Sequence, residues 1–314
     1  MTALRTLRIG TRASALARAQ TGLITAALGA ANPGLSVQTV LVSTEGDRSS
    51  APLDQIGGTG VFVSALRDAM LTGEIDVAVH SFKDLPTAPL AGIALAAVPV
   101  REDARDALCA RDRLSLLELP RGARVGTGSP RRTAQLLALD LGLTIVPIRG
   151  NVDTRLARVF GAGADLDAVV LAAAGLNRLG RSDSASELLD PIQLLPAAAQ
   201  GALAIECRAD DEGALSVLSG LDEASSRAAV TAERSLLAAL EAGCTAPVGA
   251  LAEVVEGDDG QLEVFLRGSV TAADGSDAVR LSASGPLNTA HEIGRRLAAE
   301  LIELGANTMI GSSS

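Results

Sequence analysis

The sequence predicts an α/β protein with two doubly wound lobes and a smaller α+β domain at its C-terminal end. Three observations lead to this fold class. Apolar runs of strand length alternate with segments of helical period between residues 7 and 98, and again between residues 107 and 171. A further apolar run, 198–207, follows the second set. After Gly220 the pattern changes, and strand-like segments follow one another directly, as in an antiparallel sheet.

The first lobe is expected to hold a parallel sheet. Its expected elements are, in chain order, a strand at 7–9, a helix whose N-cap is Ser14, a strand at 37–42, a helix at 61–72, and strands at 75–79 and 93–98. Strands joined by crossover helices normally lie parallel, with right-handed crossovers. The polar segment between the second strand and the second helix is long for a compact domain, and such loops are usually functional or mobile.

The second lobe is expected to repeat this pattern. Its expected elements are strands at 107–110, 124–126, 144–148 and 167–171, and a helix with Ser129 as N-cap and Pro130 at its first position. The run 198–207 then reads as a buried strand that returns to the first lobe. Two crossings between two α/β lobes produce a hinged cleft, the arrangement of two-lobed (type II periplasmic-binding-like) proteins.

The last part of the chain is expected to form a separate α+β domain. Its expected elements are a helix at 225–242, antiparallel strands at 248–256, 261–271 and 279–284, and a helix at 289–304. We therefore place domain 1 at residues 1–101 and 198–220, domain 2 at 102–197, and domain 3 at 221–314.

Composition excludes several classes of function. The 314 residues carry a net charge of −10, which argues against nucleic acid or an anionic membrane as a general partner. The start of the chain lacks a signal-peptide apolar region, and no run of roughly 18 apolar residues occurs, so we expect a cytoplasmic protein. Two histidines, and three cysteines without a C-x-x-C pair, make a metal site, a disulfide framework or a Ser-His-Asp triad improbable.

The loop after the strand 75–79 carries the only lysine in the chain. Lys83 stands beside Asp84, although every other one of the 27 basic residues is arginine. Lysine is a compact point charge, whereas arginine is a planar fork that keeps its proton. The loop also leaves the carboxyl end of a strand, where α/β sheets bind ligands. An exposed ion pair of little energetic value is the alternative.

Arginines recur just past the ends of the expected strands. A single such arginine is usually a solvated side chain, but six at equivalent points indicate a ligand with several negative groups, because guanidinium forks bind carboxylate and phosphate. The six are Arg12, Arg131, Arg132, Arg149, Arg155 and Arg178.

The three cysteines differ in their surroundings. Cys109 and Cys207 lie in apolar strands, where a free cysteine behaves as a small hydrophobe. Cys244 follows the C-cap glycine of a helix, in a loop of small residues. It is a candidate nucleophile or attachment point, with structural filler as the alternative.

Six motifs, in order, resemble those of the porphobilinogen deaminase (hydroxymethylbilane synthase) family. They are RIGTRAS at 8–14, AVHSFKDLP at 78–86, VGTGSPRR at 125–132, IRGNVDTRL at 148–156, LPAAAQGA at 195–202 and EAGCTAPVG at 241–249. The resemblance implies a monomer of three domains with a cleft between the first two. It also implies a dipyrromethane cofactor joined to Cys244 by a thioether. Four porphobilinogens would be added head to tail, with loss of ammonia, and hydroxymethylbilane released by water.

The resemblance also implies a role for each site residue. Asp84 would be the catalytic carboxylate, with Lys83 beside it. Cofactor contacts would come from Ser81, Lys83, Asp84, Thr127, Ser129, Arg131 and Arg132. Contacts to substrate or growing chain would come from Arg12, Ser14, Phe62, Arg149, Arg155, Arg178 and Gln200.

Two positions depart from the family pattern: Thr59 stands where many members have lysine, and Gly128 where many have serine. The first leaves the role of the loop around it open, and the second removes one hydroxyl donor.

Two other functions remain possible from the residues alone. A non-catalytic two-lobed anion-binding protein would explain the arginines but not the Cys244 loop or the third domain. A cysteine-nucleophile enzyme of another kind would need His80 or His291 beside Cys244.

Overall fold

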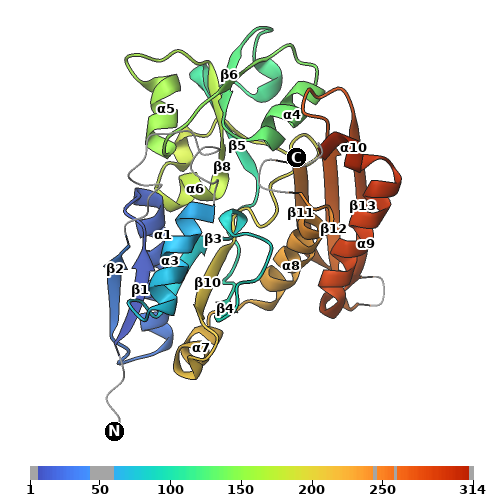
Figure 1. Ribbon diagram of the computed structural model, residues 1–314. Helices are drawn as coiled ribbons and strands as arrows, with labels where there is room; N and C mark the ends of the chain where they lie inside the picture. Colours follow the sequence, from blue (N-terminus) through green and yellow to red (C-terminus); the bar gives the residue numbers. More distant parts are fainter. Residues whose placement is uncertain (1–5, 43–59, 243–245, 258–259, 311–314) are drawn as a thin grey trace. The chain divides into compact units, whose positions relative to one another are not determined.

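The computed structural model describes residues 6–42, 60–242, 246–257 and 260–310 (Figure 1). The chain divides into two compact units, one formed by residues 1–101 and 202–227 and the other by residues 102–201 and 228–314. The boundaries of the three domains expected from the sequence stay a prediction.

The first unit contains a five-stranded sheet in the order β2-β1-β3-β10-β4. Its strands are β1 (Leu7–Thr11), β2 (Val37–Leu41), β3 (Val77–Ser81), β4 (Ile93–Ala97) and β10 (Leu203–Arg208). The first three lie parallel, whereas β10 runs antiparallel to both β3 and β4. The segment after residue 201 therefore returns to the first sheet, as the sequence predicted.

Helices cover both faces of this sheet. Helix α1 (Ala15–Ala31) and helix α7 (Glu212–Ser219) pack on one face, where Ile24 and Leu218 meet apolar side chains of β1, β3 and β10. Helix α3 (Gly60–Leu71) covers the other face through Leu66 and Met70. The predicted doubly wound arrangement is confirmed for this lobe.

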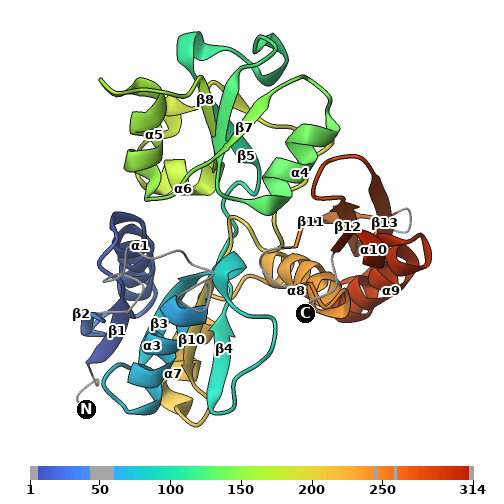
Figure 2. The ribbon, with the colours of Figure 1, turned by 45° about the horizontal axis from the view of Figure 1, so that its top comes forward.

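The second unit begins with another five-stranded sheet, in the order β7-β6-β8-β5-β9. Its strands are β5 (Asp106–Ala110), β6 (Arg124–Thr127), β7 (Thr144–Pro147), β8 (Ala168–Ala172) and the short β9 (Glu187–Leu188). Helix α4 (Pro130–Ala138) packs on one face, and α5 (Val152–Phe160) and α6 (Ala173–Arg178) pack on the other (Figure 2). This lobe is doubly wound as well.

The same unit contains the C-terminal α+β part. Strands β11 (Val248–Glu256), β12 (Leu262–Thr271) and β13 (Ala278–Pro286) form an antiparallel meander. Helices α8 (Ala224–Ala239), α9 (Ala290–Glu303) and α10 (Ala306–Ile310) cover one face of it, and the core between them includes Leu236, Leu266 and Leu297. The three predicted strands and the two longer helices are confirmed; α7, α10 and β9 were not predicted.

The expected parallel direction holds for the four strands predicted in the first lobe, because β3 and β4 both run against β10, but it is wrong for β5 in the second lobe. In each lobe the strand that enters from a crossing runs against its neighbours: β10 against β3 and β4, and β5 against β8 and β9. The parallel rule holds for strands joined by a crossover helix, and these two strands arrive without one.

The strand expected from residue 198 begins only at Leu203. Ala199 and Gly201 have φ values of 60° and 88°, so residues 199–201 form a turn rather than extended chain. Gln200 therefore lies in a turn directly before β10.

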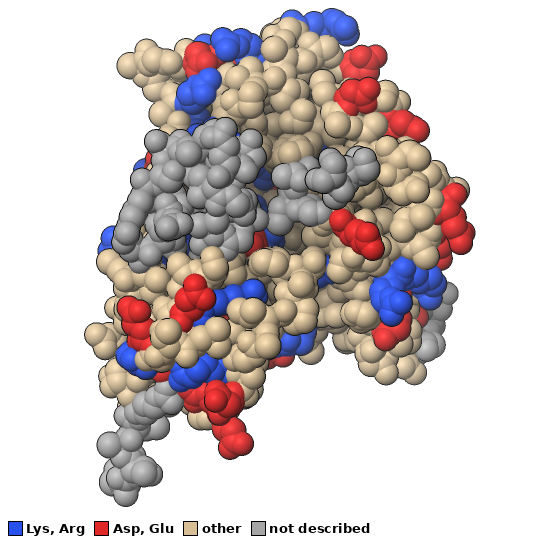
Figure 3. All heavy atoms as spheres, in the orientation of Figure 1, with Lys and Arg blue, Asp and Glu red and all other residues tan. Residues whose placement is uncertain are grey.

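Charged side chains of both signs lie on the surface of the molecule. Figure 3 shows acidic and basic side chains interspersed on the face that it draws. Within the described part of the chain, no helix is long and apolar enough to cross a membrane.

Candidate active site

The loop after β3 presents Lys83 and Asp84 on a short 3-10 turn, Phe82–Asp84. Phe82 and Leu85 are buried and fasten the turn to the body of the first unit, and the Phe82 N–H donates to the Ala202 carbonyl at 3.0 Å. Lys83 is half-buried and Asp84 is exposed. The turn therefore holds the Asp84 carboxylate at the surface on a backbone anchored from both sides.

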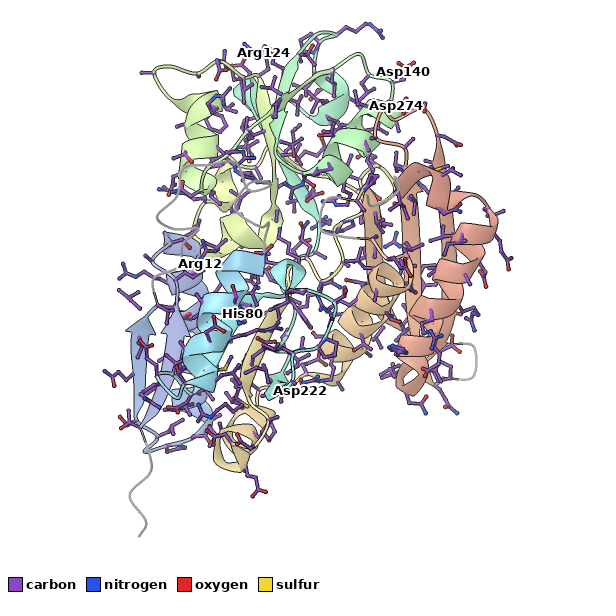
Figure 4. The ribbon with its side chains drawn as sticks, in the orientation of Figure 1. Arg12, His80, Arg124, Asp140, Asp222 and Asp274 are labelled. Carbon is purple, nitrogen blue, oxygen red and sulfur yellow. The ribbon has the colours of Figure 1, made fainter. Side chains whose placement is uncertain are left out.

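The junction between β1 and α1 holds two further predicted residues. Figure 4 shows Arg12 at this junction and His80 on β3. Ser14 is the N-cap of α1, as predicted, since its hydroxyl accepts from the Ala17 N–H at 3.2 Å. Ser14 therefore has a structural task in addition to any contact with substrate.

Gln20 joins the site although it was not predicted from the sequence. It is buried on α1, and its Nε2 donates to the Ser81 hydroxyl at 2.7 Å. Ser81 is one of the predicted cofactor contacts, so Gln20 orients a site residue from another element. Position along the chain offered no signal for this pair, because 61 residues separate them.

A buried ionic cluster lies behind the same loop. Arg67 donates to both carboxylate oxygens of Glu206, at 2.9 and 2.6 Å, and the Nε2 of His80 lies 3.3 Å from Glu206 Oε2. Burial by itself would raise the pKa of Glu206, but the nearby His80 and the hydrogen-bonded Arg67 outweigh it and lower the pKa to about 2. The cluster connects α3, β3 and β10, and its member on β3, His80, directly precedes Ser81.

In the second unit, three predicted site residues donate hydrogen bonds to the carboxylate of Asp106. Its carboxylate is fully buried and accepts from Arg131 at 2.8 Å, from Arg132 at 2.7 and 3.0 Å, and from Gln200 at 2.7 Å. Burial by itself would raise the pKa of Asp106, but the two arginine charges and the hydrogen bonds from Arg132 and Gln200 hold it well below its usual value. Asp106 was not among the site residues predicted from the sequence.

The two arginines also bind backbone carbonyls. Arg131 Nη1 donates to the Leu195 carbonyl at 2.6 Å, and Arg132 Nη1 donates to the Val170 carbonyl at 2.9 Å. Ser129 caps α4 as predicted, because its hydroxyl accepts from the Arg132 N–H at 3.4 Å. Thr127 is buried at the end of β6 and accepts from the Ser129 N–H at 3.2 Å.

Three further arginines lie at strand or helix ends of this unit. Arg155 Nε donates to the Gly150 carbonyl at 2.8 Å, and Arg178 Nη2 donates to the Gly201 carbonyl at 2.6 Å, beside Gln200. Arg149 is exposed. Burial lowers the pKa of Arg155, and the charge of Arg132 lowers it further. Positive charge is therefore concentrated around α4 and α5.

These residues fit an anionic group such as the pyrrole carboxylates of a dipyrromethane. Arg131 and Arg132 share one carboxylate, which leaves a net positive charge, and Arg155 adds to it. In addition, the Nε of Arg131 is buried without a hydrogen-bond partner among the described residues. An anion would satisfy both the charge and this donor.

Gly128, one of the two departures from the family pattern, has a steric basis. A Cβ at this position would lie 2.5 Å from the Ile148 carbonyl oxygen, so a serine here would require the backbone to shift.

Two of the three cysteines are buried and have weakly reactive thiols. Burial raises the pKa of Cys109 to about 12 and that of Cys207 to about 11. Their thiolate forms, which are the nucleophiles, are therefore scarce. Cys244 and Thr59 lie outside the described residues, as does the side chain of Phe62 on α3. The contact of His80 or His291 with Cys244 that the rival cysteine enzyme needs therefore stays untested.

Replacing Asp106 by asparagine is expected to lower the free energy of unfolding by about 3 to 5 kcal/mol, because two buried guanidinium groups would lose their carboxylate. Urea denaturation at neutral pH, followed by far-UV circular dichroism, measures this loss. Asp140→Asn is the control, since Asp140 is an exposed carboxylate just past α4 in the same unit. Equal stability of the two variants would contradict the importance of this ion pair.

The same pair predicts a dependence of stability on pH. Because the pKa of Asp106 is lower in the folded protein than its ordinary value of 3.8, its contribution is complete above that value and is lost as the pH falls toward the folded pKa. The stability of Asp106→Asn should therefore fall less steeply than that of the wild type below this pH.

Comparisons with known proteins cover nearly the whole chain. A family model described as "Porphobilinogen deaminase, dipyromethane cofactor binding domain" matches residues 7–216, and one described as "Porphobilinogen deaminase, C-terminal domain" matches residues 227–303. A porphobilinogen deaminase of Nocardia farcinica is 58% identical over 97% of this chain and 88% of its own. One of Mycobacterium tuberculosis is 57% identical over 97% of this chain and 98% of its own.

Among solved structures, the regulatory domain of MexT from Pseudomonas aeruginosa is 14% identical, with a TM-score of 0.42, over 70% of this chain and 100% of its own. The fold described above therefore rests on strand order and packing rather than on this likeness.

Proposed function

The chain belongs to the porphobilinogen deaminase family, and on that premise we propose how its residues carry out the reaction. The enzyme is a transferase that condenses four porphobilinogen molecules head to tail on a covalently attached dipyrromethane, with loss of ammonia at each step. The linear tetrapyrrole hydroxymethylbilane is then released by hydrolysis. The observation that carries this function is the pair of family matches, which cover the cofactor-binding domain and the C-terminal domain in order.

Cys244 is the proposed attachment point of the cofactor. The thiols of Cys109 and Cys207 are buried and have raised pKa values, so they are poor nucleophiles. This supports the assignment of the attachment to Cys244. When bound, the dipyrromethane supplies the pyrrole end to which substrate units are added. Ser81, Lys83, Thr127, Ser129, Arg131 and Arg132 are the proposed residues that hold its carboxylates.

Asp84 is the proposed catalytic residue. At each step the C–N bond of the substrate's aminomethyl group breaks, ammonia leaves, and a cation remains on the substrate. An exposed carboxylate on an anchored turn can stabilise this cation and accept the proton that is released when the new C–C bond forms. Lys83, the adjacent point charge, holds a carboxylate beside it.

The remaining arginines and their neighbours are proposed to hold porphobilinogen and the growing chain. Every pyrrole carries an acetate and a propionate, so the chain is a string of carboxylates that suits guanidinium donors. Arg178 donates to the Gly201 carbonyl in the turn that also holds Gln200, which supports a shared role. The proposed residues are Arg12, Ser14, Phe62, Arg149, Arg155, Arg178 and Gln200. We further propose that the enzyme works as a monomer in the cytoplasm.

The intact mass of the purified protein tests the cofactor and the function together. A mass above that of the sequence by one dipyrromethane is expected, with colour in Ehrlich's reagent, because the primer is covalent. The same sample should convert porphobilinogen to hydroxymethylbilane with release of ammonia. A mass equal to that of the sequence, with no colour and no turnover, would count against the proposal and favour a non-catalytic anion-binding protein.

A further inference from the structure

A pocket of about 440 Å³ lies within the second unit, and none of its lining residues is assigned to the reaction. One wall is the face of the C-terminal sheet that carries Phe265, Arg267 and Arg280, and the other is the segment that contains Ile192 and Leu195. Along β12, Val264 and Leu266 belong to the core beneath the helices, so alternation places Phe265 and Arg267 on the opposite face. Pockets of this volume bind small molecules.

Two arginines stand next to each other on this face. Arg267 is paired with Ser282 across the two strands, and Arg280 comes two residues before Ser282 on the same face, so the two arginines are diagonal neighbours. Like charges at such positions repel each other. The chain as a whole is strongly acidic, with a net charge of −10, which makes a local cationic pair in a pocket unusual.

The charges of the pocket do not cancel. Arg267 forms an ion pair with Glu253 at 2.8 Å, but its buried Nε has no hydrogen-bond partner among the described residues. Arg280 donates to the Ile192 carbonyl, and no described carboxylate lies within ion-pair distance of it. One positive charge therefore remains, which matches a ligand with a single anionic group.

Most of the remaining lining is apolar, and part of it is held in place by hydrogen bonds. Ile192 is 72% exposed, and a ligand would cover it together with Phe265 and Leu195. Leu195 is fixed by hydrogen bonds, since its N–H donates to Gln135 and its carbonyl accepts from Gln135 and Arg131. This part of the wall is therefore formed before a ligand arrives.

We propose that this pocket is a binding site for a small monocarboxylate with a flat apolar body. Its carboxylate would lie between Arg280 and Arg267, and its body between Phe265 and the Ile192 segment. A guanidinium fork suits one carboxylate, and the apolar wall disfavours ligands with several charges. Porphobilinogen and its oligomers, which carry two carboxylates on every ring, are therefore poor ligands here.

Naphthoate is a suitable probe for the purified holoenzyme. Its fluorescence is read without interference from Trp or Tyr, because the chain contains neither. We expect saturable one-to-one binding, and binding at least tenfold weaker for the uncharged amide of the same acid. Arg280→Gln should weaken naphthoate at least tenfold, and Ile192→Asp should also weaken it by placing a negative charge beside the carboxylate.

Two controls separate this pocket from other cationic sites. Arg295→Gln, at an exposed arginine on α9, and Arg155→Gln, in the proposed substrate site, should leave naphthoate affinity unchanged. Unchanged binding in Arg280→Gln, equal binding of the amide, or loss of binding in Arg155→Gln would each overturn the proposal. Far-UV circular dichroism of every variant verifies that it is folded.

Discussion

Alanine at position 84 is expected to leave a folded protein whose turnover of porphobilinogen falls by a factor of about 10² to 10⁴, the range typical of a lost general acid or base. The Asp84 carboxylate is exposed, and the turn that carries it is fastened by the buried side chains of Phe82 and Leu85. Removing the carboxylate should therefore cost little stability. Steady-state turnover and thermal unfolding of the same preparation measure the two effects separately.

Two comparisons make the Asp84 result specific. Asp68→Ala removes an exposed carboxylate from α3 in the same unit and should leave turnover near that of the wild type. Asp84→Glu keeps the carboxylate and should retain more activity than Asp84→Ala. Intact mass of each variant shows whether the cofactor is present, so loss of catalysis is distinguished from loss of primer. Near-normal turnover in Asp84→Ala would remove the catalytic assignment.

Serine at position 244 is expected to abolish both the cofactor and the activity. A serine hydroxyl is a far weaker nucleophile than a thiolate, so no thioether can form and no primer is available for chain growth. The intact mass should equal that of the substituted sequence, Ehrlich's reagent should give no colour, and porphobilinogen should not be consumed.

The two buried cysteines are the matched controls for this variant. Cys109→Ala and Cys207→Ala should keep the heavier mass, because burial raises the pKa of both thiols and leaves little thiolate. Alanine avoids placing an unpaired hydroxyl in the core. An adduct that persists in Cys244→Ser but disappears from one of these variants would move the attachment to that residue.

Local signals in the sequence predicted much of the scaffold. The N-caps Ser14 and Ser129 and the helix start at Pro130 were confirmed, because a capping hydroxyl acts on an N–H only three residues away. The chain's return to the first sheet was also predicted, from the apolar run before Cys207. The direction of β5 and β10 was not predicted, because it depends on how the chain enters each sheet.

The site was predicted less completely than the scaffold, because many of its contacts join residues that are far apart in the sequence. Arginines after strand ends could be counted, but their partner Asp106 lies 25 and 26 residues from them and is buried at the start of β5. Gln20 and Glu206, which contact Ser81 and His80, also come from distant parts of the chain. Pairings of this kind depend on which strands become neighbours, and periodicity does not report that.

The sequence by itself determined the family, the Lys83–Asp84 loop and the identity of the three cysteines, because motifs and composition can be read directly from the residues. Only the tertiary structure decided that Asp106 neutralises part of the arginine cluster and that Arg267 and Arg280 share one sheet face. Burial and long-range pairing set the charge and reactivity of a side chain, and both arise only when the chain is folded.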